Sequence, residues 1–203
     1  MQAIFIEAGH GKSTLGFKDM GAQCRFGDTI YYERNIAKEL ARRVLTILKG
    51  KPELKGTLIQ GVGVETDANL KGKIKFVNSV IRENKFTPSK CFGIAIHMNA
   101  IGSGNATGFE VWHQKNLSSV PAAESLARAW GSYKITALRP KPIINTKDHW
   151  KYHRLYIDDY LCPYPLIETS FISNLGDVSS IINNYDRVAE CLAHGILEYI
   201  RSK

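Results

Sequence analysis

Short apolar segments alternate with amphipathic segments along this chain, and this alternation restricts the fold more than any other feature of the sequence. Residues 4–6, 57–64 and 91–96 are apolar runs of strand length. The segment 32–49 repeats apolar side chains every four residues, as a helix with one buried face does. Helical spacing recurs at 73–84, 121–133 and 186–201. Strands that alternate with helices form layered α/β domains, so the sequence predicts an α/β fold with a largely parallel sheet.

The length and composition indicate one ordinary globular domain over residues 1–203. Hydrophobic residues make up 44% of the chain and charged residues 23%, close to globular averages. No apolar run approaches the ~18 residues of a membrane-spanning helix. The N-terminus enters the first apolar run without a basic segment, so we expect no cleaved secretion signal and synthesis in the cytoplasm.

The net charge limits the classes of possible partner, and the cysteines indicate the state of the thiols. A net charge of +8 favours an anionic partner, such as nucleic acid, an anionic lipid surface or an anionic cell-wall polymer. The basic residues are dispersed and form no recognised nucleic-acid module, so we expect no nucleic-acid partner. The four cysteines form no C-x-x-C pair, which favours reduced structural thiols over disulfides or a cysteine zinc site.

Two histidines and two carboxylates are placed where catalytic residues gather in α/β proteins. His10 and His97 each end an apolar run, and Glu168 follows a third at 166–167. In an open α/β sheet, ligands bind beyond the carboxyl ends of the strands. Glu33 lies in the first turn of the predicted helix on its apolar side, where a buried carboxylate needs a strong partner such as a metal. Two histidines and one carboxylate can bind zinc and leave a second carboxylate to act as a base.

Other candidate sites are weaker. Gly11, Lys12 and Ser13 suggest a phosphate-binding loop, but that motif needs a glycine where the sequence has Ile6. His149 and His153 have the spacing of helical zinc ligands, yet the glutamate of that motif is absent, and their role stays open. His113 and His194 are interpreted as structural. The segment 139–165 is irregular and rich in proline and aromatic residues, which predicts a functional loop that could line a substrate groove.

Five motifs in the right order resemble zinc-dependent N-acetylmuramoyl-L-alanine amidases of the Amidase_3 type, a family of bacterial cell-wall amidases and phage endolysins. The resemblance spans nearly the whole chain. The motifs are Gly9-His10-Gly11 with Gly21-Ala22, the helix-opening Glu33, Ala95-Ile96-His97-Met98-Asn99-Ala100, Gly108-Phe109-Glu110-Val111, and Glu168-Thr169-Ser170-Phe171-Ile172-Ser173-Asn174 followed by Asp177.

The chain departs from the family pattern at several positions. Glu7-Ala8 replaces the usual Asp-Pro before the first histidine, so the support of His10 is expected to differ. Lys73 replaces an arginine, Ser170 replaces a glycine, and a Thr-Arg pair near Glu65 is missing. None of these changes removes a ligand or the base, so we expect them to alter substrate preference more than activity.

The resemblance implies a three-layer αβα fold with a mixed, mostly parallel sheet of about six strands and helices on both faces. It implies that His10, Glu33 and His97 bind Zn²⁺, that Glu168 is the general base, and that Asn99 contacts substrate. The implied reaction is hydrolysis of the amide bond between N-acetylmuramic acid and L-alanine in peptidoglycan, with anionic wall polymers as further partners. The alternatives are a zinc peptidase that cuts another amide of the stem peptide and a non-catalytic wall-binding module.

The same resemblance suggests where the protein acts. Because we expect no signal peptide and no wall-binding domain, we favour a phage or prophage lysin that reaches the wall through a separate pore. An excised catalytic domain of an exported bacterial enzyme is the other possibility. The sequence leaves the wall chemotype, the host and the oligomeric state open.

Overall fold

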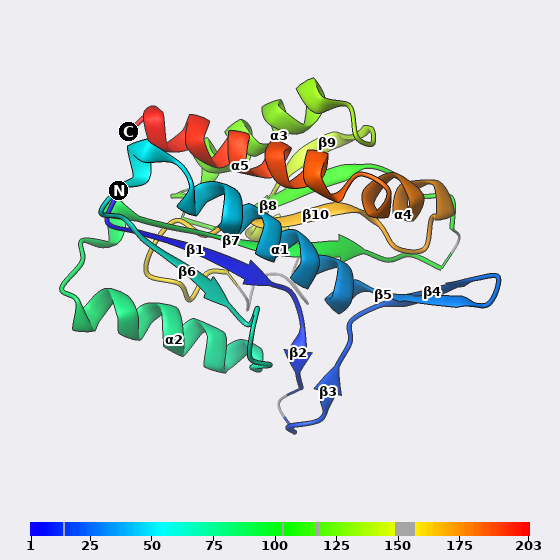
Figure 1. The fold of residues 1–203 in the computed structure, drawn as a ribbon, viewed down its shortest axis with the longest axis horizontal. Coiled ribbons are helices and arrows are strands. Elements are labelled where there is room, and N and C mark those ends of the chain that lie inside the picture. The colour runs from blue at the N-terminus through cyan, green and yellow to red at the C-terminus, as the bar shows by residue number, and fades with distance from the viewer. Residues whose placement is uncertain (14, 103, 117, 149–156) are drawn as a thin grey trace.

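The computed structural model describes residues 1–203 except 14, 103, 117 and 149–156, and its centre is a six-stranded sheet (Figure 1). The strand order is β6-β1-β7-β10-β8-β9. The strands are β1 (Ala3–Ala8), β6 (Leu58–Val62), β7 (Cys91–Asn99), β8 (Phe109–His113), β9 (Leu138–Asn145) and β10 (Leu166–Phe171). Neighbouring strands are parallel except β10 and β8, which are antiparallel. The predicted mixed, mostly parallel sheet of about six strands is confirmed.

Helices cover both faces of the sheet (Figure 1). The face toward α1 (Glu33–Lys49), α3 (Val120–Tyr133) and α5 (Tyr185–Arg201) carries the larger hydrophobic core. The other face packs against α2 (Leu70–Glu83) and the segment 157–164, and carries the smaller core. A short helix, α4 (Leu175–Ile182), follows β10. Alternate residues of each strand therefore enter different cores, as the period of a β-strand requires.

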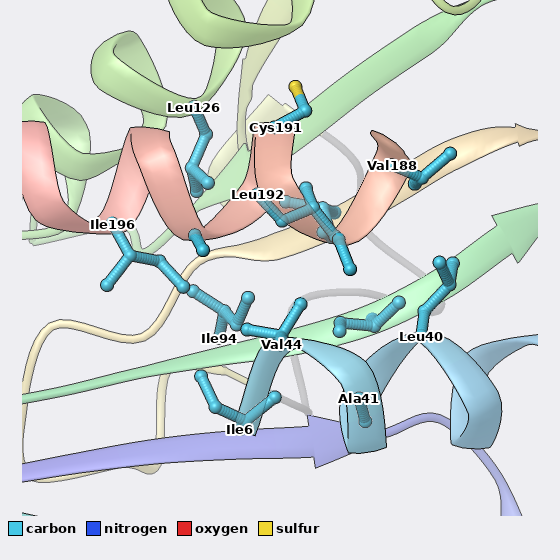
Figure 2. Packing of buried hydrophobic residues seen from close by; sticks show 14 of the residues in the cluster. Ile6, Leu40, Ala41, Val44, Ile94, Leu126, Val188, Cys191, Leu192 and Ile196 are labelled. Atoms are coloured by element: carbon cyan, nitrogen blue, oxygen red, sulfur yellow. The ribbon is translucent and has the colours of Figure 1, made fainter. Parts of the chain in front are cut away.

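Aliphatic side chains fill the larger core between the sheet and two helices. Figure 2 shows Ile6 and Ile94 of the sheet with Val44 of α1 and Leu192 of α5. All four are at most 1% exposed. Complete burial of such a side chain contributes roughly 1.5–3 kcal/mol, so these contacts fix α1 and α5 on the sheet. The predicted helix 32–49 is thus confirmed, with its apolar side facing the strands.

The structure contains short elements that the sequence analysis did not predict. Two small hairpins lie between β1 and α1, one formed by β2 (Gly11–Lys12) with β3 (Lys18–Asp19) and the other by β4 (Gln23–Phe26) with β5 (Thr29–Tyr32). The prediction that residues 139–165 are irregular is wrong for the first part of the segment, because β9 forms the edge of the sheet there. An edge strand tolerates the missing N–H groups of Pro140 and Pro142. Short 3₁₀ turns occupy Pro52–Leu54, Pro88–Lys90 and Thr146–Asp148.

Cys91, Cys162 and Cys191 are buried free thiols, and Cys24 is a partly exposed one. Within the part of the chain that the structure describes, no helix is long and apolar enough to cross a membrane.

Candidate metal centre

Three side chains from distant parts of the chain meet at the carboxyl end of the sheet. His10 follows β1, Glu33 opens α1, and His97 lies near the end of β7. Nε2 of His10 is 3.0 Å from Oε2 of Glu33, and Nδ1 of His97 is 2.9 Å from Oε1 of Glu33. One ligand atom from each residue lies within 4.8 Å of the others. The structure therefore brings together the three residues that the sequence resemblance implied as ligands.

Close backbone approach at two glycines makes this cluster possible. A Cβ on Gly9 would lie 2.6 Å from the ring of His97. A Cβ on Gly21 would lie 2.5 Å from the ring of His10 and 2.7 Å from Oε2 of Glu33. His10 itself has a positive φ of 59°, which is uncommon for a residue with a side chain. The glycines at these positions are needed because any side chain would displace the histidines.

The three side chains are also oriented by neighbouring groups. Nδ1 of His10 hydrogen-bonds Oδ2 of Asp19 at 3.0 Å, which leaves Nε2 facing the cluster. The carboxylate of Glu33 accepts hydrogen bonds from the backbone N–H groups of Ala22 and Met98, at 3.0 and 3.2 Å. An imidazole held through its second nitrogen by a carboxylate is the usual arrangement of a metal-binding histidine.

The pKa shifts reflect strong mutual attraction within the cluster. Burial by itself would raise the pKa of Glu33, but the hydrogen bonds and charges of His10 and His97 outweigh it and hold that pKa well below its ordinary value. Burial also opposes a charge on His10, and Glu33 and Asp19 nevertheless raise its pKa. The cluster therefore favours a positive charge next to the Glu33 carboxylate.

Glu168 lies beside this cluster without joining it. Its Cα pairs with His97 of β7 on one side and with Glu110 of β8 on the other. The side chain is 4% exposed, and Oε2 has no hydrogen-bond partner within the described residues. Burial, with the nearby charges of Glu33 and Glu110, raises its pKa well above the ordinary value. A buried carboxylate oxygen without a partner is uncommon and points to a ligand or a catalytic role.

The expectation that Glu168 ends its strand is wrong. β10 continues to Phe171, and Glu168 is its third residue. Pairing with β8 stops at Glu168, and the register with β7 shifts between Glu168 and Phe171. This irregularity, and not the end of the strand, marks the position of the carboxylate.

The cluster opens into a cavity of about 490 Å³ on the α2 side of the sheet. Residues that line it include Lys12, Lys73, His97, Asn99, Tyr160 and Glu168. The side-chain amide of Asn99 donates to Oε1 of Glu110 at 2.8 Å, and its oxygen accepts from the N–H of Ala100. Asn99 is thus held rigidly on the cavity wall, and its contact with substrate stays a prediction.

Two residues that support the cluster were missed by the sequence analysis. Asp19 lies in β3, a strand of only two residues, where the sequence shows no periodicity. Arg34 is buried, donates to the carbonyl of Gly9 at 3.2 Å and pairs with Asp67 at 2.8 Å. It follows Glu33 directly, yet nothing local in the sequence shows that it reaches a backbone carbonyl 25 residues away.

The remaining histidines agree with the sequence analysis where the structure describes them. Nδ1 of His113 is buried against the carbonyl of Gln114, and the ring of His194 stacks edge-on against Tyr133. Neither belongs to the cluster. His149 and His153 lie outside the described residues.

The cluster fits zinc by its donor set. Two imidazole nitrogens and one carboxylate are typical of catalytic zinc sites, which keep a further position open. The three donors face one another, and Glu168, whose Oε2 has no hydrogen-bond partner among the described residues, lines the same cavity. Glu168 is not part of the donor group.

Comparison with known families gives a match over most of the chain. The family model Amidase_3, described as N-acetylmuramoyl-L-alanine amidase, matches residues 4–198. No curated protein sequence gives a significant match.

Solved structures share the fold over the full length. An N-acetylmuramoyl-L-alanine amidase from Clostridium difficile 630 is 23% identical, with a TM-score of 0.78 over 100% of this chain and 98% of that one. The catalytic domain of CwlV, an amidase from Bacillus (Paenibacillus) polymyxa var. colistinus, is 25% identical, with a TM-score of 0.75 and full coverage, 100%, of both chains. The catalytic domain of the CD27L endolysin, which targets Clostridia Difficile, is 18% identical, with a TM-score of 0.70 and 98% of each chain covered.

Proposed function

Because this chain belongs to the Amidase_3 family of N-acetylmuramoyl-L-alanine amidases, we propose that it is a zinc-dependent hydrolase that cuts the amide bond between N-acetylmuramic acid and L-alanine in peptidoglycan. The observation that carries the proposal is the convergence of His10, Glu33 and His97 within 4.8 Å beside the buried carboxylate of Glu168. This arrangement combines a metal-binding cluster with a separate base in one cavity.

His10, Glu33 and His97 would hold the zinc ion in this proposal. The bound ion would supply Lewis-acid chemistry, lowering the pKa of water and polarising the scissile carbonyl. Asp19 keeps His10 in the tautomer that presents Nε2. Gly9 and Gly21 leave the space in which the two rings approach Glu33.

Glu168 would accept the proton of the attacking water and then deliver it to the leaving amine of L-alanine. The burial that raises its pKa favours the protonated form, from which the proton would be delivered. Its Oε2 has no competing partner among the described residues and so is free to face the reacting atoms. Asn99 lies on the same cavity, and we assign it a substrate contact.

The cell wall is the proposed place of action, because it holds the substrate. A positive net charge of +8 would favour anionic wall polymers as further partners. The similarity to the catalytic domain of an endolysin supports a lytic role. The stretch 1–203 would act as one catalytic domain.

Mass spectrometry of digested peptidoglycan tests the proposal. Amidase cleavage leaves intact glycan strands and releases stem peptides with a free L-alanine amine. New amines inside the stem, with L-alanine still attached to the glycan, would identify a zinc peptidase instead. Binding to the wall without any cleavage would identify a non-catalytic module. Glu168→Gln protein is the control for contaminating hydrolases.

A further inference from the structure

A buried lysine lies on the wall of the same cavity as the metal cluster. Lys73, in the first turn of α2, is 2% exposed. Its Nζ donates to the carbonyl of Ala8 at 2.6 Å and is 3.3 Å from Oε1 of Glu7. An ammonium group has three N–H donors, and the third meets no acceptor within the described residues. A buried cation that lines a cavity with an unused donor is suited to bind an anionic group of a ligand.

The partner of this lysine is itself fixed. Oε2 of Glu7 accepts hydrogen bonds from the hydroxyls of Tyr160 and Tyr164, at 2.5 and 3.0 Å. The two tyrosine rings stack with their centroids 3.6 Å apart. Three donors therefore hold the Glu7 carboxylate in one position beside Lys73. The lysine cannot move away without breaking this buried network, so its position is set before a ligand arrives.

The strand register places the ion pair one pleat away from the proposed reaction centre. Glu7 pairs with Ala95 on β7, and His97, two residues further along, pairs with Glu168. Two residues along a strand span about 7 Å, which is also the length of about two residues of an extended bound peptide. Ala95, which lies opposite Glu7 on the neighbouring strand, has a small side chain and lines the cavity. A group on the second residue after the cut amide bond is therefore within reach of Lys73.

The charges on this wall favour an anion. Lys12 of β2 also lines the cavity, so two lysines line it beside the single carboxylate of Glu7, and the first turn of α2 contains no acidic residue. The other acidic residues of the lining, Asp19, Glu33 and Glu168, lie at the metal cluster. The cavity thus has an acidic part that suits a metal ion and a basic part that suits a carboxylate.

Resting on the proposed function, we infer that Lys73 determines specificity by binding the free carboxylate of the stem-peptide residue that follows L-alanine. A stem with the α-carboxylate of D-glutamate at this position would be preferred over a stem in which the same group is a carboxamide. The amide lacks the negative charge that would attract the ammonium group of Lys73.

The experiment compares two synthetic muropeptides that differ only in this carboxylate or carboxamide, with the zinc-loaded protein. We expect a KM about tenfold lower for the carboxylate stem with similar kcat, the scale of one charge-assisted hydrogen bond. Lys73→Met should raise the KM for the carboxylate stem to the KM for the amide stem. The KM for the amide stem should stay unchanged. Lys73→Arg should retain the preference. Lys71→Met, on the same turn but exposed, is the matched control.

Lys73→Met leaves Glu7 buried and unpaired, which is strongly destabilising. The double variant Glu7→Gln/Lys73→Met keeps this wall neutral, and its loss of preference tests the same point in a protein with no unpaired charge. Equal KM values for the two stems in the unmodified protein would overturn the role of Lys73 and leave the amidase proposal intact. If neither stem is cut at the muramoyl amide, the proposed function fails, and the role of Lys73 falls with it.

Discussion

Asp19 and His10 are joined by a hydrogen bond of 3.0 Å between Oδ2 and Nδ1, and this contact links the β2–β3 hairpin to the metal cluster. Asp19 is fixed in turn, because its Oδ1 accepts the N–H of Gly21 at 3.0 Å. The hairpin therefore orients one proposed ligand and positions the glycine that makes room for it.

Asp19→Asn is expected to weaken zinc binding about 10- to 100-fold, because the amide cannot stabilise the His10 tautomer as a carboxylate does. Competition with a chromogenic chelator measures the zinc affinity. Asp28→Asn, an exposed position in the neighbouring hairpin, is the control and should bind like the unmodified protein. An unchanged affinity in Asp19→Asn would show that the hairpin does not support the metal.

The purified protein is expected to hold about one zinc ion per chain, and chelator treatment should abolish cleavage that added zinc restores. Alanine at His10 or His97 should lower both zinc content and activity, because each supplies one of three donors. Atomic absorption gives the stoichiometry. Full zinc content in the His10→Ala/His97→Ala double variant would remove these residues from the site.

Glu168→Gln should separate catalysis from metal binding. The amide keeps the size of the side chain but cannot accept a proton, so turnover should fall by ~10²-fold or more while zinc content stays unchanged. Glu33→Gln should instead lose zinc, since an amide is a poor ligand. Zinc content and turnover measured on both variants decide the roles, and near-normal turnover in folded Glu168→Gln protein would contradict the assignment of the base.

The metal-free protein should be stabilised by Glu168→Gln at neutral pH. A carboxyl group whose pKa is raised by folding binds its proton more tightly in the native state. Stability from this group is therefore present below the unfolded pKa, about 4.3 for glutamate, and falls as the pH rises toward the raised value. The difference in melting temperature between Glu168→Gln and the unmodified protein should grow from pH 4 to pH 7. Calorimetry of both metal-free proteins measures it, and a lower melting temperature for the variant at pH 7 would contradict the unfavourable burial of Glu168.

Association with isolated cell walls should weaken as salt rises past physiological strength, where the Debye length is ~8 Å. The net charge of +8 would then be screened from anionic wall polymers. Sedimentation of the protein with walls, before and after removal of those polymers, gives the comparison. If the bound fraction changes with neither the salt concentration nor the removal of the polymers, the positive charge serves only solubility.

Local patterns in the sequence determined the main elements of the fold. The four-residue spacing of apolar side chains predicted α1 and its buried side, and apolar runs predicted β1 and β7 with His10 and His97 at their ends. These signals are local, because helix and strand periods repeat within a few residues. The roles of His10, Glu33 and His97 came from a resemblance that five short motifs carry.

Only the tertiary structure decided the contacts that support the site. Tyr160 reaches Glu7 across 153 residues, and Arg34 reaches Gly9 across 25. β9 forms an edge strand despite its two prolines because it pairs with β8. Glu168 lies inside β10, and its pairing with His97 of β7 brings it to the metal cluster. Such contacts depend on which strands become neighbours, and that choice is made by the packing of the whole core.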